Sequence, residues 1–446
     1  MTEHKRKLTK EQIRKRKIKK FKQALIFYGA VLIVLVLVVW GLVSGVKGLV
    51  HLLTPKPKPP EPVKPSVEQL ISDADMLAAS YDFDKAIELV KSYGDDYSEK
   101  PELTSAVERY ESAKATMVKF DDVYSITHVF FHTLIFDTSK AFDGEYTQDG
   151  YNQYMTTVGE FRKMLDEMYA RGFVLVNLHD VAAPVTDENG VTKFEPGEIW
   201  LPEGKKPMVM SQDDVSYYTY MEDDGFASKI VIDDDGYPTC EYIQDDGTVV
   251  RGDYDLVPIL EEFIHEHPDF SYRGARATLA ITGYDGVLGY RTCPSGDGYN
   301  EADIPKAKDV ADRMKELGWV FASHSWGHRH YGSLTADRIQ EDAGKWDAEV
   351  KPILGDTDIL IYAHGDDIAG IEEYSGAKFN VLKSFGFNYF CNVDSHVSWV
   401  QIGSDYFRQG RRNIDGYRMY YYPQMLEDLF DVSEVYDSSR PIVPEI

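Results

Sequence analysis

The chain has 446 residues, of which 43% are hydrophobic and 27% charged, a balance typical of a folded protein with a sizeable core. Its formal net charge is −26, but residues 1–23 carry eleven Lys or Arg against two Glu, which leaves −35 for the remainder. No basic patch extends over the fold, which argues against nucleic-acid binding, and three distant cysteines without a C-x-x-C argue against a disulfide framework or a cysteine zinc site.

Residues 24–46 form a long apolar run, and no residue from Gln23 to Val46 is charged. A helix of about 20 such residues spans the roughly 30 Å hydrocarbon layer of a bilayer. We predict an uncleaved signal anchor, with a cleaved signal peptide as the alternative, because no clear A-x-A site follows. The basic tail at residues 1–23 predicts a single-pass cell-membrane protein with a cytoplasmic amino terminus and an extracellular remainder.

Two segments separate this anchor from the main domain. Residues 54–66 are rich in proline and favour extended polyproline geometry, which predicts a semi-rigid linker. Residues 67–120 place apolar residues such as Leu70, Ala74 and Leu77 at helical spacing and predict a small helical stalk. Part of this segment weakly resembles one tetratricopeptide unit, which cannot stack alone, so peptide binding is only an alternative to the stalk role.

From about residue 121, short apolar runs alternate with longer amphipathic stretches, which predicts an α/β domain over residues 121–432. About seven parallel strands favour a distorted (β/α) barrel over an open sheet, with reactive residues at the strands' carboxyl ends. The expected strands are residues 128–135, 173–177, 207–211, 277–282, 318–322, 358–362 and 387–393. The expected helices are residues 157–171, 255–267, 303–317, 335–353 and 373–386.

Other segments of this domain are rich in turn residues. Residues 183–206 and 221–254 contain the runs DENG, DDDG and QDDG, which predict insertions made of turns and hairpins. We expect these insertions to form a rim over a substrate groove. Residues 433–446 are expected to form a carboxyl-terminal tail.

Asp213 and Asp214 follow the apolar run Met208–Met210 at a predicted strand end. Two adjacent carboxylates there point in different directions, so one can bind a metal while the other accepts a proton from water. The alternative is that they are ordinary solvated residues, because the chain is acidic throughout.

His324 and His328 follow the apolar run at 319–322, again at a predicted strand end. Histidines four residues apart share one face of a helical turn and can bind one ion, although twelve histidines also allow this spacing by chance. Two histidines and one carboxylate, here Asp214, are a usual zinc ligand set that leaves room for water.

At this point the chain resembles the polysaccharide deacetylase family, also called the NodB-homology fold, from about Val123 to about Asp431. The resemblance rests on an ordered series of segments: HVFFH at His128–His132, Phe161–His179, SQDD at Ser211–Asp214, HSxxH at His324–His328, Ser333–Thr335, YAHG at Tyr362–Gly365, and KSFGF at Lys383–Phe387. The two metal motifs are specific in combination, whereas the other segments support the order of elements only.

The resemblance implies a distorted (β/α) barrel that hydrolyses N-acetyl or O-acetyl groups on glycans. By position in the motifs, Asp213 would be the general base. Asp214, His324 and His328 would hold a divalent ion, usually zinc. The natural substrate would be an envelope or extracellular polysaccharide such as the peptidoglycan of the cell wall.

The chain departs from the family pattern in three places. The loop that often carries an Arg beside the base reads YAHGD here. No histidine follows His396 to supply the usual general acid. The Asp-x-x-x-Asp-Trp motif is only partial. His364 or His132 is a possible replacement acid, with a role in the pocket wall as the alternative for each. These departures also keep open a second hypothesis: a catalytically impaired glycan-binding or scaffold protein of the cell envelope.

Three arginines near the end of the domain have no assigned motif: Arg408, Arg411 and Arg412. They are candidates to bind substrate or orient Asp213, and a surface role is equally open. Aromatic residues near the motifs, such as Tyr220 and Trp326, are candidates to stack on sugar rings, with core packing as the default explanation.

Overall fold

The computed structural model of the chain describes residues 65–446. The predicted basic tail (1–23), the membrane anchor (24–46) and all but the last two residues of the linker (54–66) lie outside the described residues, so they stay predictions. Within residues 65–446, no helix combines the length and the apolar character that crossing a membrane requires.

The segment predicted as a helical stalk is helical. It contains α2 (Val67–Ala79), α3 (Phe83–Lys91), a 3-10 turn and α4 (Pro101–Lys114). Side-chain oxygens of Ser66 and Asp82 cap the first two helices by accepting backbone N–H bonds that would otherwise be unpaired. The helices contact the main domain directly, since the Tyr81 hydroxyl donates to the Asp269 carbonyl at 2.9 Å.

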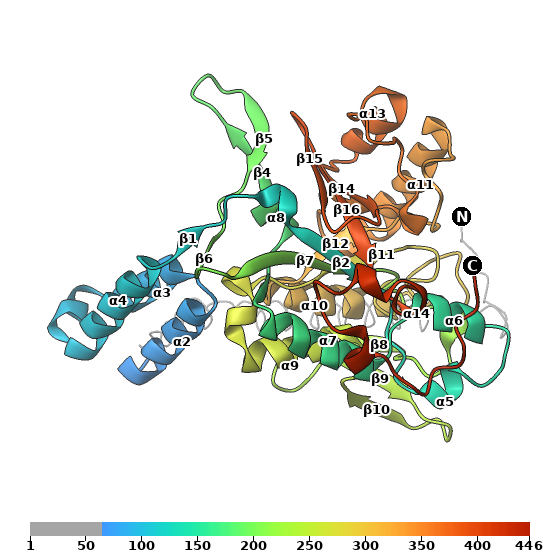
Figure 1. The fold of residues 1–446 in the computed structure, drawn as a ribbon, viewed down its shortest axis with the longest axis horizontal. Coiled ribbons are helices and arrows are strands. Elements are labelled where there is room, and N and C mark those ends of the chain that lie inside the picture. The colour runs from blue at the N-terminus through green and yellow to red at the C-terminus, as the bar shows by residue number, and fades with distance from the viewer. Residues whose placement is uncertain (1–64) are drawn as a thin grey trace, which may run out of the picture. The chain divides into compact units, whose positions relative to one another are not determined.

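Seven parallel strands close into a ring in the order β2, β7, β11, β12, β13, β14, β16 and back to β2. This arrangement confirms the predicted (β/α) barrel (Figure 1). Their bounds are β2 (Thr127–Phe131), β7 (Lys206–Gln212), β11 (Thr278–Ile281), β12 (Val320–Ser323), β13 (Ile359–Ile361), β14 (Tyr389–Val393) and β16 (Phe407–Asn413).

Two strands differ from the expected set. The predicted strand at 173–177 exists as β3 (Phe173–Leu175), but it pairs with the beginning of β7, and β11 takes the place beside the end of β7. The seventh ring strand is instead β16, which was not expected because its sequence, FRQGRRN, has one large apolar residue. Its arginines are buried because acidic partners neutralise them.

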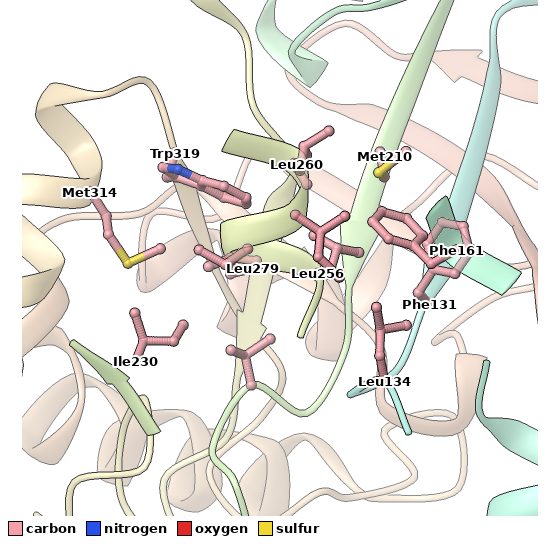
Figure 2. Packing of buried hydrophobic residues seen from close by; sticks show 14 of the residues in the cluster. Phe131, Leu134, Phe161, Met210, Ile230, Leu256, Leu260, Leu279, Met314 and Trp319 are labelled. Atoms are coloured by element: carbon pink, nitrogen blue, oxygen red, sulfur yellow. The ribbon is translucent and has the colours of Figure 1, made fainter. Parts of the chain in front are cut away.

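The expected helices form on the outside of the barrel. They are α7 (Val158–Ala170), α9 (Leu256–Glu266), α10 (Asp303–Glu316), α11 (Ala336–Glu349), α12 (Lys351–Leu354) and α13 (Gly376–Ser384). Figure 2 shows outward side chains of three strands, Phe131, Met210 and Leu279, packed against Phe161 of α7 and Leu256 of α9. Burying each such side chain stabilises the fold by about 1.5–3 kcal/mol.

Because side chains alternate along a strand, every second residue points into the barrel. Interior residues such as Val209, Ala280 and Cys391 form one buried cluster with the inner faces of α2 and α4, including Leu70 and Leu103. The helical segment therefore covers the amino ends of the strands. The carboxyl ends of the strands lie at the other end of the barrel, where polar residues follow them.

The two predicted insertions form hairpins, as expected. β4 (Ala182–Thr186) and β5 (Thr192–Pro196) form a hairpin that projects from the barrel (Figure 1). β8 (Lys229–Ile232), β9 (Pro238–Ile243) and β10 (Val249–Gly252) form an antiparallel three-stranded sheet. The remaining elements are β1 (Val118–Lys119), β6 (Trp200–Leu201), β15 (Trp399–Ile402), α5 (Thr138–Ala141), α6 (Gln148–Tyr154), α8 (Leu178–Val181), α14 (Gly416–Tyr421) and α15 (Val432–Val435).

Candidate metal centre

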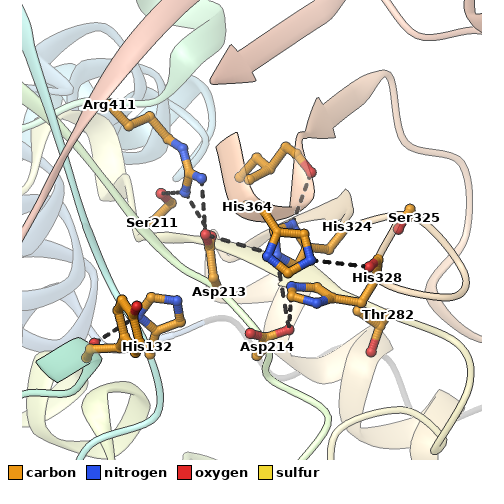
Figure 3. Close-up of polar contacts among 12 residues, drawn as sticks. His132, Ser211, Asp213, Asp214, Thr282, His324, Ser325, His328, His364 and Arg411 are labelled. Atoms are coloured by element: carbon orange, nitrogen blue, oxygen red, sulfur yellow. Dashed lines mark hydrogen bonds and ion pairs between the residues drawn. The ribbon is translucent and has the colours of Figure 1, made fainter. Parts of the chain in front are cut away.

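The structure brings Asp214, His324 and His328 together at the carboxyl ends of β7 and β12. One donor atom from each residue lies within 4.8 Å of the others. Asp214 Oδ1 is 3.8 Å from His324 Nε2 and 3.7 Å from His328 Nε2 (Figure 3). Two donors on a tetrahedral zinc ion lie roughly 3.3 Å apart, given bonds of about 2.0–2.1 Å. The two Asp214 separations exceed this value by roughly half an ångström, and all three donors lie within 4.8 Å of one another, so they can converge on a single divalent ion.

The backbone around these residues is strained. Asp214, Ser325 and His328 have φ values of 62°, 60° and 50°, in the left-handed region that side chains other than glycine rarely adopt. Such residues cost about 1–3 kcal/mol each and persist only where surrounding contacts impose them. One such contact is the Ser325 hydroxyl, which accepts from the backbone N–H of Arg329 at 2.9 Å and closes the turn between the histidines.

Neighbouring groups orient the ligand atoms. His324 Nδ1 lies 2.9 Å from the Ile361 carbonyl, to which it donates, so Nε2 presents its lone pair to the site. The Tyr218 hydroxyl donates to Asp214 Oδ1 at 2.5 Å, and burial raises the pKa of Tyr218 well above its usual value, so it stays a donor. Burial also lowers the pKa of His328, which favours the neutral form that a metal requires.

Asp213 is held by Arg411 rather than by the predicted ligands. Arg411 donates from both terminal nitrogens to the two carboxylate oxygens, at 2.6 and 2.9 Å. Burial raises the pKa of Asp213, but Arg411 and His324 offset this effect and hold the pKa below its usual range. Asp213 is therefore a fixed carboxylate whose Oδ2 lies 3.9 Å from His324 Nε2.

The alternation of side chains explains why these residues meet. On β16, Arg411 is in phase with the interior residues Phe407 and Gln409, just as Asp213 is in phase with Val209 on β7. Arg408 and Arg412 are out of phase with Arg411 and pair elsewhere, with Asp367 and Asp428. Of the three arginines, only Arg411 therefore orients Asp213, and none of them is a surface residue.

The sequence contains a hairpin pattern that predicts β16, although β16 is not an apolar run. The strands β15 and β16 form an antiparallel hairpin. The residues that connect them, Gly403–Tyr406, include turn formers. A search for hairpins would have paired these two runs and placed the arginines inside a sheet.

The two histidines considered as replacement acids have different surroundings. His132 follows β2, lines the same cavity as Asp213, and its Nδ1 lies 2.9 Å from the Tyr154 carbonyl. His364 Nε2 lies 3.3 Å from the His328 carbonyl, and its ring stacks on His330 at 3.8 Å. Burial and the neighbouring imidazoles of His328 and His330 lower the pKa of His364, which disfavours the protonated form.

A cavity of about 640 Å³ opens over the candidate centre. Its wall includes Tyr154 on α6, Tyr417 on α14 and Tyr220. None of the described residues that line this cavity comes from 183–206 or 221–254, so the two insertions do not form its wall, and their role as a rim stays a prediction. Of the tyrosines near the SQDD motif, Tyr217 and Tyr218 are buried, and Tyr220 is exposed to the cavity.

Comparisons with known proteins found no matching family model and no matching curated protein. Among solved structures, the chain is similar to the Streptococcus pyogenes deacetylase PplD in complex with acetate, at 14% identity and a TM-score of 0.37. That match covers 71% of this chain and 99% of the other. The chain is also similar to the chitin deacetylase of the fungal pathogen Colletotrichum lindemuthianum, at 10% identity and a TM-score of 0.21, over 40% and 75% of the two chains.

Proposed function

We propose that the protein is a metal-dependent hydrolase that removes acetyl groups from a glycan. The observation that carries the proposal is the meeting of Asp214, His324 and His328 with the ionised Asp213 in one open cavity. Arg411 takes the position beside the base that the YAHGD loop leaves without an arginine. This contact supplies an arginine for one of the three departures that motivate the hypothesis of a catalytically impaired scaffold.

A divalent ion held by Asp214, His324 and His328, most simply zinc, would supply a Lewis acid that polarises the acetyl carbonyl and acidifies water. Asp213 accepts the proton of the water that attacks the carbonyl carbon. Arg411 keeps Asp213 ionised and fixes both of its oxygens, so the base does not rotate away from the cavity.

The bond from the carbonyl carbon to the sugar nitrogen or oxygen then breaks, and the leaving group needs a proton. His132 is the better placed acid, because the Tyr154 carbonyl holds its Nδ1–H and leaves Nε2 available for donation. In the view of Figure 3, His132 and His364 lie on opposite sides of Asp213. The products are acetate and a free amine or hydroxyl on the glycan.

The substrate we propose is an acetylated envelope or extracellular polysaccharide such as peptidoglycan. This choice depends on the sequence prediction of a membrane anchor at 24–46 with the barrel outside the cell. Both N-acetyl and O-acetyl groups suit the chemistry, since the carbonyl is attacked in the same way.

The experiment is acetate release by the purified, zinc-loaded protein from N-acetylglucosamine oligomers, peptidoglycan and an O-acetylated glycan. We expect release that stops on chelation and returns when zinc is restored. A protein that holds zinc and yet frees no acetate from any of these glycans would disprove the proposal.

The acid is tested by comparing His132→Gln with His364→Gln. We expect His132→Gln to lower acetate release from the glycan by about 10²–10⁴-fold, the usual contribution of general acid catalysis. Hydrolysis of 4-nitrophenyl acetate should change little, because its leaving group needs no proton. If His364→Gln gives this pattern and His132→Gln does not, the assignment is reversed.

A further inference from the structure

A second groove, of about 530 Å³, lies beside the catalytic cavity. The short helix α14 lines both, with Tyr417 and Arg418 on the cavity and Met419 and Tyr420 on the groove. We call the second one the α14–α15 groove, and its other main lining residues are Arg171, Phe430, Asp431, Ser433 and Tyr436. An α-helix of six residues is about 9 Å long, so one extended molecule can reach both sites.

Tyrosine rings connect the two sites without a gap. The Tyr417 ring is 4.8 Å from that of Tyr421, Tyr421 is 4.9 Å from Tyr420, and Tyr420 is 6.3 Å from Tyr436, measured between ring centroids. Tyr420 is 43% exposed. Exposed apolar groups that lie side by side are a common feature of ligand-binding grooves.

The groups around these rings suit a neutral polyhydroxylated ligand. Each tyrosine has an apolar ring face on which the apolar face of a sugar ring can stack, although the Tyr421 hydroxyl already donates to the Val443 carbonyl at 2.7 Å. Arg171 pairs with Glu167 at 3.0 Å, and Glu427 and Asp431 also line the groove, so the groove carries no excess of positive charge. A groove without excess positive charge does not favour phosphate or another polyanion.

We propose that the α14–α15 groove binds further sugar units of the polysaccharide whose acetylated unit lies in the catalytic cavity. The inference rests on the proposed function, because the cavity defines where the reacting unit lies. It adds that the preferred substrate is a chain of several sugars. The rings of Tyr417, Tyr421 and Tyr420 are the path that the chain follows between the two sites.

The experiment compares kcat/KM for the disaccharide and the hexasaccharide of N-acetylglucosamine. We expect wild type to prefer the hexasaccharide, and Tyr420→Ala to reduce that preference about five- to tenfold, chiefly through KM, as loss of one stacking contact implies. Tyr420→Phe keeps the ring and should keep the preference. The matched control is Tyr237→Ala, which removes a tyrosine of 41% exposure from the turn between β8 and β9.

A second measurement separates this inference from the proposed function. Calorimetry on Asp213→Asn, with and without Tyr420→Ala, reports hexasaccharide binding without turnover. Weaker binding on loss of Tyr420, together with a wild-type protein that releases no acetate, would support the groove and disprove the deacetylase. Acetate release with the same length preference in wild type and Tyr420→Ala would overturn the groove and leave the deacetylase intact.

Discussion

Two arginine–carboxylate pairs in this molecule are buried to the same degree but have different surroundings. Arg411 pairs with Asp213 at the barrel mouth, and Arg440 pairs with Glu160 beneath the carboxyl-terminal segment. Both pairs make contacts as short as 2.6 Å, and the side chains are 0–4% exposed. Burial and geometry alone therefore do not distinguish a reactive carboxylate from a structural one.

The difference lies in what else surrounds each carboxylate. Glu160 also accepts from the backbone N–H groups of Thr157 and Asp437, and Arg440 donates to Asn152, so protein groups satisfy the whole pair. Asp213 instead faces the 640 Å³ cavity, with His324 3.9 Å away. We propose Asp213 as the reactive carboxylate because it has open space and adjacent imidazoles, whereas the complete satisfaction of Glu160 is typical of a structural pair.

The largest expected effect comes from Asp213→Asn, which keeps the shape of the side chain but removes its ability to accept a proton. We expect acetate release to fall by about 10²–10⁴-fold, because a general base contributes that much. Bound zinc should stay near wild-type content, since Asp213 is not among the three ligands. Acetate release within threefold of wild type would remove Asp213 from the chemistry.

Glu160→Gln breaks the structural pair and leaves the Arg440 charge buried without a partner. We expect the free energy of unfolding, measured in urea, to fall by about 3–5 kcal/mol. Acetate release per folded molecule should not change, because Glu160 does not line the cavity. A stable variant with lost activity would contradict the distinction between the two pairs.

Arg411→Lys keeps the positive charge beside Asp213 but loses the two-point contact, so the expected effect is smaller. The pKa of Asp213 is lowered in the folded protein, so the pair stabilises the fold above about pH 4, the ordinary pKa of aspartate, and this stability is lost as the pH falls below that value. We expect the variant to be about 1–2 kcal/mol less stable at pH 7, and the difference to shrink at pH 3. A difference that does not depend on pH would show that packing, not charge, explains the effect.

Much of the fold could be predicted from sequence because the ring strands are mostly short apolar runs. β7 and β11, for example, are buried almost throughout and are flanked by amphipathic helices. β16 could not be found in this way, because its burial depends on acidic residues elsewhere in the chain. Asp367 and Asp428, which neutralise Arg408 and Arg412, are partners that only the fold reveals.

The three metal-ligand residues of the candidate centre could also be predicted from sequence, but the groups that orient them could not. Asp214, His324 and His328 follow strand ends, and the carboxyl ends of parallel strands meet at one edge of a barrel. The contact of Arg411 with Asp213 joins residues 198 positions apart, so no local pattern indicates it. The group that orients His324 is the backbone carbonyl of Ile361, so no residue type in the sequence indicates this contact.

The most direct test of the account is the zinc content and affinity of the purified protein, compared with His324→Ala and Asp213→Asn. The account predicts one zinc ion per chain in wild type and in Asp213→Asn, and loss of that ion in His324→Ala. It would be contradicted if wild type held no stoichiometric ion, or if His324→Ala held zinc as tightly as wild type.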